Sequence, residues 1–172
     1  MIKYNLYKME NQLEPISVQI KLFFQNPIFL ACFCSWFGAQ FIKTAISLCY
    51  GRVKSFKQLI ELMLVKTGGM PSSHSALVTA LTTTIGIRNG LNSDIFFVSA
   101  IFLAVTVRDA FGVRRSSGIT IKRVNDISNE LMEKGELKTY KPIKEVNGHK
   151  PMEVICGCFL GFFIGLGFAL IK

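Results

Sequence analysis

Histidine, tryptophan and acidic residues are scarce in this chain. Of its 172 residues, two are His, one is Trp and 11 are Asp or Glu. A magnesium site needs several carboxylates that converge, and Asp109 and Asp126 alone do not provide them, so we predict no metal and no cofactor. Because His74 and His149 are the only histidines, each is weighed below as a group that exchanges protons near neutral pH.

Other features are also absent. The five cysteines, an odd number, all lie in apolar runs, where they are expected to be small buried hydrophobic side chains rather than disulfides or metal ligands. Residues 1–26 are too polar for a cleavable signal peptide and lack its apolar centre. The chain has no internal repeat and no low-complexity segment, so we expect a single membrane domain over residues 1–172.

Long apolar runs, by contrast, make up much of the chain. Half of all residues are hydrophobic and 15 are Phe, which is unusual for a soluble domain. The runs cover residues 27–49, 75–88, 94–107 and 152–171. A helix needs about 20 apolar residues to cross a bilayer, so the first and last runs qualify outright and the middle two are short. The sequence therefore predicts an all-α integral membrane helical bundle with about four apolar helices.

Two further helices are expected outside these runs. Spaced apolar residues in 1–26 indicate an amphipathic helix at the membrane interface, which leaves residues 27–171 for the bundle. In the long 108–150 connection, apolar residues recur every three to four positions over 119–134, which predicts a short helix that ends at Gly135. Residues 136–148 are predicted to be an irregular return to the last helix.

Alternation of the four apolar helices places the polar motifs on one side of the membrane. Loops 50–73 and 108–150 share a face, and the 88–93 turn lies on the opposite face. The formal charge is +9, but no basic stripe carries interleaved aromatic residues, so nucleic acid is not an expected partner. Basic loops favour a cytoplasmic face and contact with anionic membrane lipids. A phosphate site would gather the same charges, so sidedness stays open.

Residues 68–76, Gly-Gly-Met-Pro-Ser-Ser-His-Ser-Ala, carry the strongest functional signal. Glycine and proline fix a tight turn, and Ser72 and Ser73 then stand where a helix takes its N-cap. The unpaired N–H groups and the positive dipole end of a first helical turn bind anions, most often phosphate. His74 would give or take a proton beside the bound group.

A second set of residues fits the same chemistry. Arg114 and Arg115 are suited to bidentate contacts with phosphate oxygens, and His149 stands at the start of another apolar helix. Glu153, four residues after His149, would orient its ring for nucleophilic attack, or would only favour the helix dipole. Asp109 is equally well explained by an ion pair at the end of its helix and by a catalytic role.

The last apolar run carries glycines at every fourth position. Gly157, Gly161 and Gly165 form the small-residue pattern of closely packed membrane helices. Packing within one chain is the favoured interpretation, and a homo-oligomer through this helix face is the alternative.

Together these motifs resemble a known superfamily. Pro71-Ser72-Ser73-His74 is similar to the Pro-Ser-Gly-His motif of the type-2 phosphatidic acid phosphatases and vanadium haloperoxidases. Over residues 27–165, the chain resembles the divergent, small membrane branch of that superfamily. The matching stretches are Ser35-Trp36, Ala39-Gln40 and Lys43, residues 68–76, Asp109 to Arg115 with Gly118, and Gly148 to Val154.

The resemblance implies which residues bind phosphate. Lys43 matches the lysine of the first motif, with Lys66 as a competing candidate, and Arg114 or Arg115 matches the arginine of the third motif. The superfamily keeps that arginine and its histidine in one short segment, whereas here a long connection separates Arg115 from His149.

The resemblance also implies the catalytic roles. His74 would protonate the leaving group, His149 would attack phosphorus, and Glu153 would replace the orienting Asp of the superfamily. Gln40 and Asp109 would support the site. The superfamily mechanism uses no metal.

The function expected from these residues is a membrane phosphatase. It would hydrolyse a lipid phosphate or pyrophosphate through a phosphohistidine, in the manner of an acid phosphatase. The alternative is a phosphate- or headgroup-binding membrane protein without turnover, such as a transporter or scaffold. Vanadate-dependent halide oxidation is a third, disfavoured interpretation.

Overall fold

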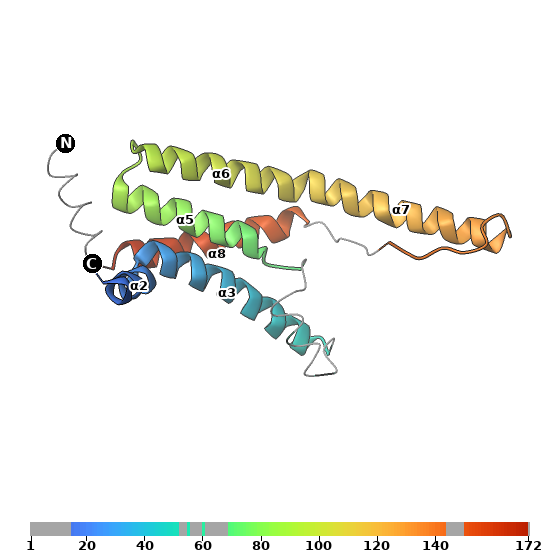
Figure 1. Ribbon diagram of the computed structural model, residues 1–172, viewed down its shortest axis with the longest axis horizontal. Helices are drawn as coiled ribbons and strands as arrows, with labels where there is room; N and C mark the ends of the chain where they lie inside the picture. The colour runs from blue at the N-terminus through green and yellow to red at the C-terminus, as the bar shows by residue number, and fades with distance from the viewer. Residues whose placement is uncertain (1–14, 52–54, 56–59, 61–68, 144–149, 172) are drawn as a thin grey trace.

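The computed structural model describes residues 15–51, 55, 60, 69–143 and 150–171, and in these ranges the chain forms helices and connecting segments without a strand. The helices are α2 (Ile16–Gln25), α3 (Pro27–Cys49), α5 (Ser73–Asn89), α6 (Asp94–Phe111), α7 (Val113–Glu133) and α8 (Pro151–Ala169). The predicted all-α class is confirmed. Figure 1 shows α3, α5, α6 and α8 side by side as a bundle, with α7 extending beyond it.

Side-chain caps explain where several of these helices begin. Asn26 precedes α3, and its Oδ1 accepts a hydrogen bond from the Ile28 N–H at 2.8 Å. Ser93 caps α6 in the same manner, through the Phe96 N–H at 3.4 Å. Pro151 occupies the first turn of α8, as the sequence predicts. Local chemistry therefore sets these boundaries before any packing is considered.

α5 lies at the centre of the bundle and contacts α3, α6 and α8 (Figure 1). More of its residues are buried than in any other described helix, although many of them carry hydroxyls. Two of these hydroxyls join it to its neighbours. Thr82 donates a hydrogen bond to the Ser99 carbonyl of α6 at 3.1 Å, and Thr84 donates one to the Gly165 carbonyl of α8 at 3.2 Å. Hydrogen bonds from small polar side chains thus join α5 to its neighbours. Such bonds matter in a membrane, because lipid provides no hydrophobic driving force for helix association.

The glycine face of α8 packs directly on α5. A Cβ atom added at Gly157, Gly161 or Gly165 would lie under 3.0 Å from a carbonyl oxygen of Ser72, Ala76 or Ala80, respectively. The absence of side chains therefore lets the two backbones approach closely over three successive turns. This face is filled by α5 of the same chain, as the intramolecular interpretation predicts, and a homo-oligomer through it would require α5 to be displaced.

α6 and α7 follow one another almost without a break, which differs from the expected short helix. Gly112 alone separates them, and Figure 1 shows one long rod. α7 begins at Val113 rather than at 119. Residues 113–118 are helical even though they include two serines and Gly118. Its end agrees with the prediction, since Gly135 follows it with a φ of +73°.

The return segment after α7 is held by one side chain. Asn125 is buried and accepts hydrogen bonds through Oδ1 from the Tyr140 hydroxyl at 2.5 Å and from the Ile143 N–H at 3.0 Å. Its Nδ2 also donates to the Ile143 carbonyl at 2.9 Å. Residues 136–143 are irregular, as expected, and fold back along α7 because these three bonds replace regular backbone pairing. Residues 144–148 of the expected return lie outside the described residues.

In the part of the chain that the structure describes, three helical stretches are long and apolar enough to cross a membrane, namely Pro27–Cys49, Asp94–Glu133 and Pro151–Ala169. α5 has 17 residues and is shorter than these spans, in agreement with the short run predicted from the sequence. The outer faces of the spans expose large apolar side chains such as Phe41, Phe102 and Phe163. α2 has no buried residue and exposes Phe23 and Phe24, which fits the interfacial helix expected over 1–26. Residues 1–14 of that segment lie outside the described residues.

Candidate phosphate site at the start of α5

The turn before α5 gives the helix a buried serine cap. Gly69 has a φ of +85°, a conformation that glycine adopts without strain. Ser72 follows as the N-cap, and its Oγ accepts hydrogen bonds from the Ser75 N–H at 3.4 Å and the Ser75 hydroxyl at 3.0 Å. The predicted cap is therefore confirmed, and it fixes the first turn of α5, whose N–H groups form the candidate anion site.

Lys43 reaches this turn from α3. Its Nζ donates a hydrogen bond to the Ser73 Oγ at 3.4 Å, and only 7% of Lys43 is exposed. A lysine buried in a membrane helix is costly and generally marks a functional site. The structure thus brings together one cation and two serine hydroxyls, the donors that a phosphate needs, from segments distant in sequence.

The start of α8 is tied to the start of α5. The Ser72 N–H donates a hydrogen bond to the Glu153 carbonyl oxygen at 2.8 Å. The Glu153 carboxylate accepts one from the Lys150 N–H at 3.1 Å and interacts electrostatically with the Lys43 ammonium. One carboxylate oxygen of Glu153 therefore caps α8. The sequence left open a structural role for this residue through the helix dipole and did not predict the cap.

The remaining described candidates surround this junction. His74 lies in the first turn of α5 and is exposed. Asp109 lies in the last turn of α6 and is partly exposed. Gln40 is one turn before Lys43 on α3, and only 6% of it is exposed. Its Oε1 has no hydrogen-bond partner among the residues that the structure describes. An acceptor that is buried without a partner is available to a ligand or a water.

Four site candidates fall partly or wholly outside the description. His149 and Lys66 lie outside the described residues. The backbones of Arg114 and Arg115 belong to the first turn of α7, but their side chains are not described. Their roles stay predictions. Within the described part of the chain, no group of three His, Cys, Asp or Glu side chains gathers as a metal site would require.

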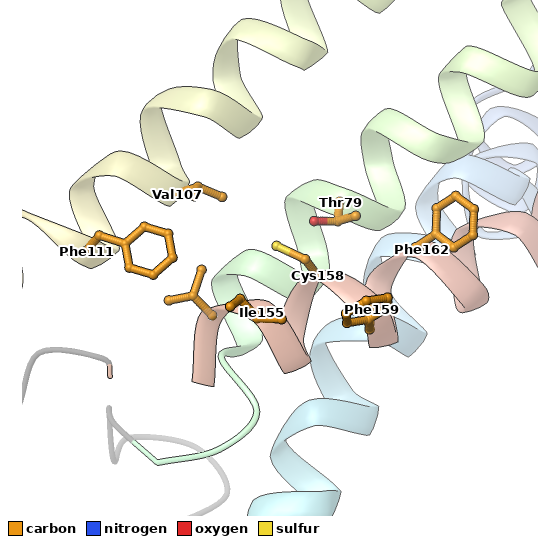
Figure 2. Close-up of a pocket in the computed structure, with 8 residues that line it drawn as sticks. Thr79, Val107, Phe111, Ile155, Cys158, Phe159 and Phe162 are labelled. Atoms are coloured by element: carbon orange, nitrogen blue, oxygen red, sulfur yellow. The ribbon is translucent and has the colours of Figure 1, made fainter. Parts of the chain in front are cut away.

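A groove that the sequence did not reveal opens beside this junction. It has a volume of about 460 Å³ and lies between α5, α6 and α8. Figure 2 shows Val107 and Phe111 of α6 on one side, Ile155, Cys158 and Phe159 of α8 on the other, and Thr79 of α5 close to Cys158. The only sequence signal was the hydroxyl-rich, small-residue composition of α5, which indicates close helix packing but not a groove.

The fold defines a helical membrane protein in which the starts of two helices and one buried lysine form a junction. The chain belongs to the Divergent PAP2 family, whose model matches residues 24–164.

Similarity to a bacterial membrane protein agrees with this assignment. The chain is 38% identical over 138 residues to the uncharacterized membrane protein YuiD of Bacillus subtilis (strain 168), and the match covers 74% of this chain and 84% of the relative. No solved structure matches. The suspected relationship to the type-2 phosphatidic acid phosphatases is therefore confirmed at the level of the family.

Proposed function

We propose that this protein is an integral membrane phosphatase that hydrolyses a lipid phosphate or pyrophosphate. The observation that carries the proposal is the junction in which Ser72 hydrogen-bonds to the start of α8 while buried Lys43 donates to Ser73. These groups, with the positive end of the α5 dipole, would stabilise the charge on a transferring phosphoryl group.

In the proposed reaction a histidine ring nitrogen attacks phosphorus. His149 forms the P–N bond while the P–O bond to the lipid breaks, and His74 gives its proton to the departing oxygen. His74 then takes a proton from water, which attacks phosphorus, breaks the P–N bond and releases phosphate. His74 is exposed in the first turn of α5. This exposure supports its proposed role, because a general acid has to reach the substrate.

The phosphate ligands in this proposal come from two directions. Lys43, Ser72 and Ser73 approach from the described junction. Arg114 and Arg115 belong to the start of α7, directly after the break at Gly112, and are proposed to bind the equatorial oxygens. Lys66 remains the competing candidate for the first-motif lysine.

One observation favours a binding protein without turnover as the second candidate. The Glu153 carboxylate already caps α8 through the Lys150 N–H, whereas the proposed mechanism assigns it to the ring of His149. A headgroup-binding transporter or scaffold would need the anion site but not an oriented nucleophile.

Phosphate release from purified protein separates the two candidates. Wild type, His149→Ala and His74→Ala are each offered phosphatidic acid, phosphatidylglycerophosphate and prenyl (pyro)phosphates in mixed micelles. A phosphatase releases phosphate from at least one lipid, and both variants lose that activity. If the wild type releases no more phosphate than His149→Ala on every lipid, the phosphatase proposal is wrong and the binding protein remains.

A further inference from the structure

We propose that the groove between α6 and α8 holds an acyl chain of a glycerolipid phosphate, and that Thr79 donates a hydrogen bond to its ester carbonyl. The inference rests on the proposed function, because it names the class of lipid that the same site takes. It assigns to Thr79 a role in specificity.

The walls of the groove suit a hydrocarbon chain. Apart from Thr79, the side chains drawn in Figure 2 are aliphatic, aromatic or thiol groups. Phe159 and Ile155 are also among the exposed large hydrophobic residues, so the groove opens on a face of the bundle that meets lipid. An unbranched chain entering sideways from the bilayer would replace lipid contacts with equivalent apolar ones.

Thr79 is the exception in these walls. Thr82 and Thr84 of the same helix donate to the carbonyls four residues earlier, at 2.9 and 2.7 Å, which is the ordinary solution for a threonine in a helix. The Thr79 hydroxyl has no hydrogen-bond partner among the described residues, although only 8% of Thr79 is exposed. Figure 2 shows the Thr79 hydroxyl pointing toward the α6 side of the groove.

A buried hydroxyl without a partner is costly, so its orientation calls for a ligand that can accept its proton. Such an acceptor has to lie inside an apolar groove, and a carbonyl oxygen partway along a lipid chain meets this requirement. A hydrocarbon alone would leave the hydroxyl unsatisfied.

The depth of Thr79 matches the position of an ester in a glycerolipid phosphate. Thr79 lies six residues after Ser73, which is about 9 Å along the helix. In a diacylglycerol phosphate, five bonds separate phosphorus from the nearer ester carbon and span about 6 Å at ordinary bond lengths. The hydrogen bond to Thr79 would add about 2.8 Å. A prenyl phosphate has no acceptor at this depth.

The groove also begins where the phosphate site lies. Val154 lines its wall and directly follows Glu153, whose carbonyl oxygen binds the Ser72 N–H. On the opposite wall, Phe111 is the last residue of α6. A single lipid would therefore place its phosphate at the start of α5 and its chain between α6 and α8.

The test compares lipids that differ only at the carbonyl. Binding of a diacylglycerol phosphonate, its ether-linked counterpart and a prenyl phosphonate of similar length is measured by native mass spectrometry. Phosphonates resist hydrolysis, so the measurement does not depend on turnover. We expect the wild type to bind the ester lipid about 3- to 10-fold more tightly than the ether lipid, as one neutral hydrogen bond provides.

Two matched variants assign that preference to the hydroxyl. Thr79→Val keeps the shape and removes the donor, so it should bind both lipids equally. Thr79→Ser keeps the donor and should retain the preference. Equal binding of ester and ether lipid by the wild type, or tighter binding of the prenyl phosphonate, would overturn the inference.

A second pair of variants tests the groove itself. Val107→Trp fills the groove and should weaken binding of the ester lipid at least 10-fold. Val105→Trp, at an exposed position of α6 outside the groove, should not. Equal binding by the two variants would place the chain elsewhere and contradict the inference. Absence of phosphate release together with an ester preference that Thr79→Val loses would instead reject only the phosphatase proposal.

Discussion

Lys43 is the residue at which stability and the proposed function make opposite demands. Its ammonium is buried in a membrane helix and reaches the Ser73 hydroxyl at 3.4 Å. Removing a buried charge in favour of an apolar side chain of similar length often leaves a protein as stable as before, or more stable. The same replacement, however, removes the cation that the proposed phosphate site needs.

We therefore predict that Lys43→Met lowers phosphate release by about 100- to 1,000-fold, as loss of one electrostatic donor does in other enzymes. Its melting temperature in detergent should equal or exceed that of the wild type. Lys21→Met, at an exposed position of α2, is the control and should change neither quantity. A Lys43→Met protein that melts earlier but keeps full activity would make Lys43 a structural residue.

The roles of the site residues could be predicted from the sequence to different degrees. The cap at Ser72 follows from its own neighbourhood, so it was predictable and the structure confirms it. The resemblance named Lys43, and the structure brings it to Ser73. Thr79 gave no signal, because a threonine in an apolar run looks the same whether its hydroxyl bonds to its own helix or faces a groove.

Among the elements, α5 and α8 form the central pair of the site. Their backbones meet because glycines on α8 face the carbonyl oxygens of α5, and this contact lets the Ser72 N–H reach the Glu153 carbonyl. The geometry of the candidate site therefore depends on how closely these two helices approach.

The glycine face gives a matched pair of substitutions. Gly161→Ala would place a Cβ under 3.0 Å from the Ala76 carbonyl oxygen, so we expect a loss of about 1–3 kcal/mol in the free energy of unfolding. Gly167→Ala meets nothing within 4 Å and should be neutral or slightly stabilising. Thermal unfolding in detergent compares them, and equal melting temperatures would show that the helices do not pack as described.

The elements were predictable in type more than in extent. The apolar composition predicts a run over 27–49, and α3 has these bounds. Asn26 caps its start in the structure. The start of α7 was placed too late, because serines and Gly118 normally favour a helix end, whereas here the helix resumes directly after Gly112. The central position of α5 depends on its neighbours, and its own composition could not reveal it.

Across the whole molecule, the described polar groups of the site gather at one end of the bundle. The opposite end is marked by the hydrogen bond from the Arg88 guanidinium to the Ile171 carbonyl at 2.9 Å. Helix alternation predicts this division, because a helix that runs the length of the bundle ends at the side opposite to its start. The side of the membrane that each end faces is predicted only from the charge of the loops.

We expect the site end to face the cytoplasm. In a variant whose five cysteines are replaced by serine, a single cysteine is introduced at Asn92 or at Lys134, both exposed positions. A membrane-impermeant thiol reagent added to intact cells should label position 92 and not position 134. The reverse pattern would show that the site faces outwards and that its basic residues serve the phosphate rather than topology.

The central claim is that the phosphoryl group forms a covalent intermediate on His149. Purified protein is mixed with a lipid carrying ³²P in its phosphate, quenched in alkali within milliseconds, and digested to locate the label. The account predicts an acid-labile phosphohistidine at position 149 in the wild type and no label in His149→Ala. Lipid hydrolysis without any protein-bound label, or an equal label in His149→Ala, would contradict it.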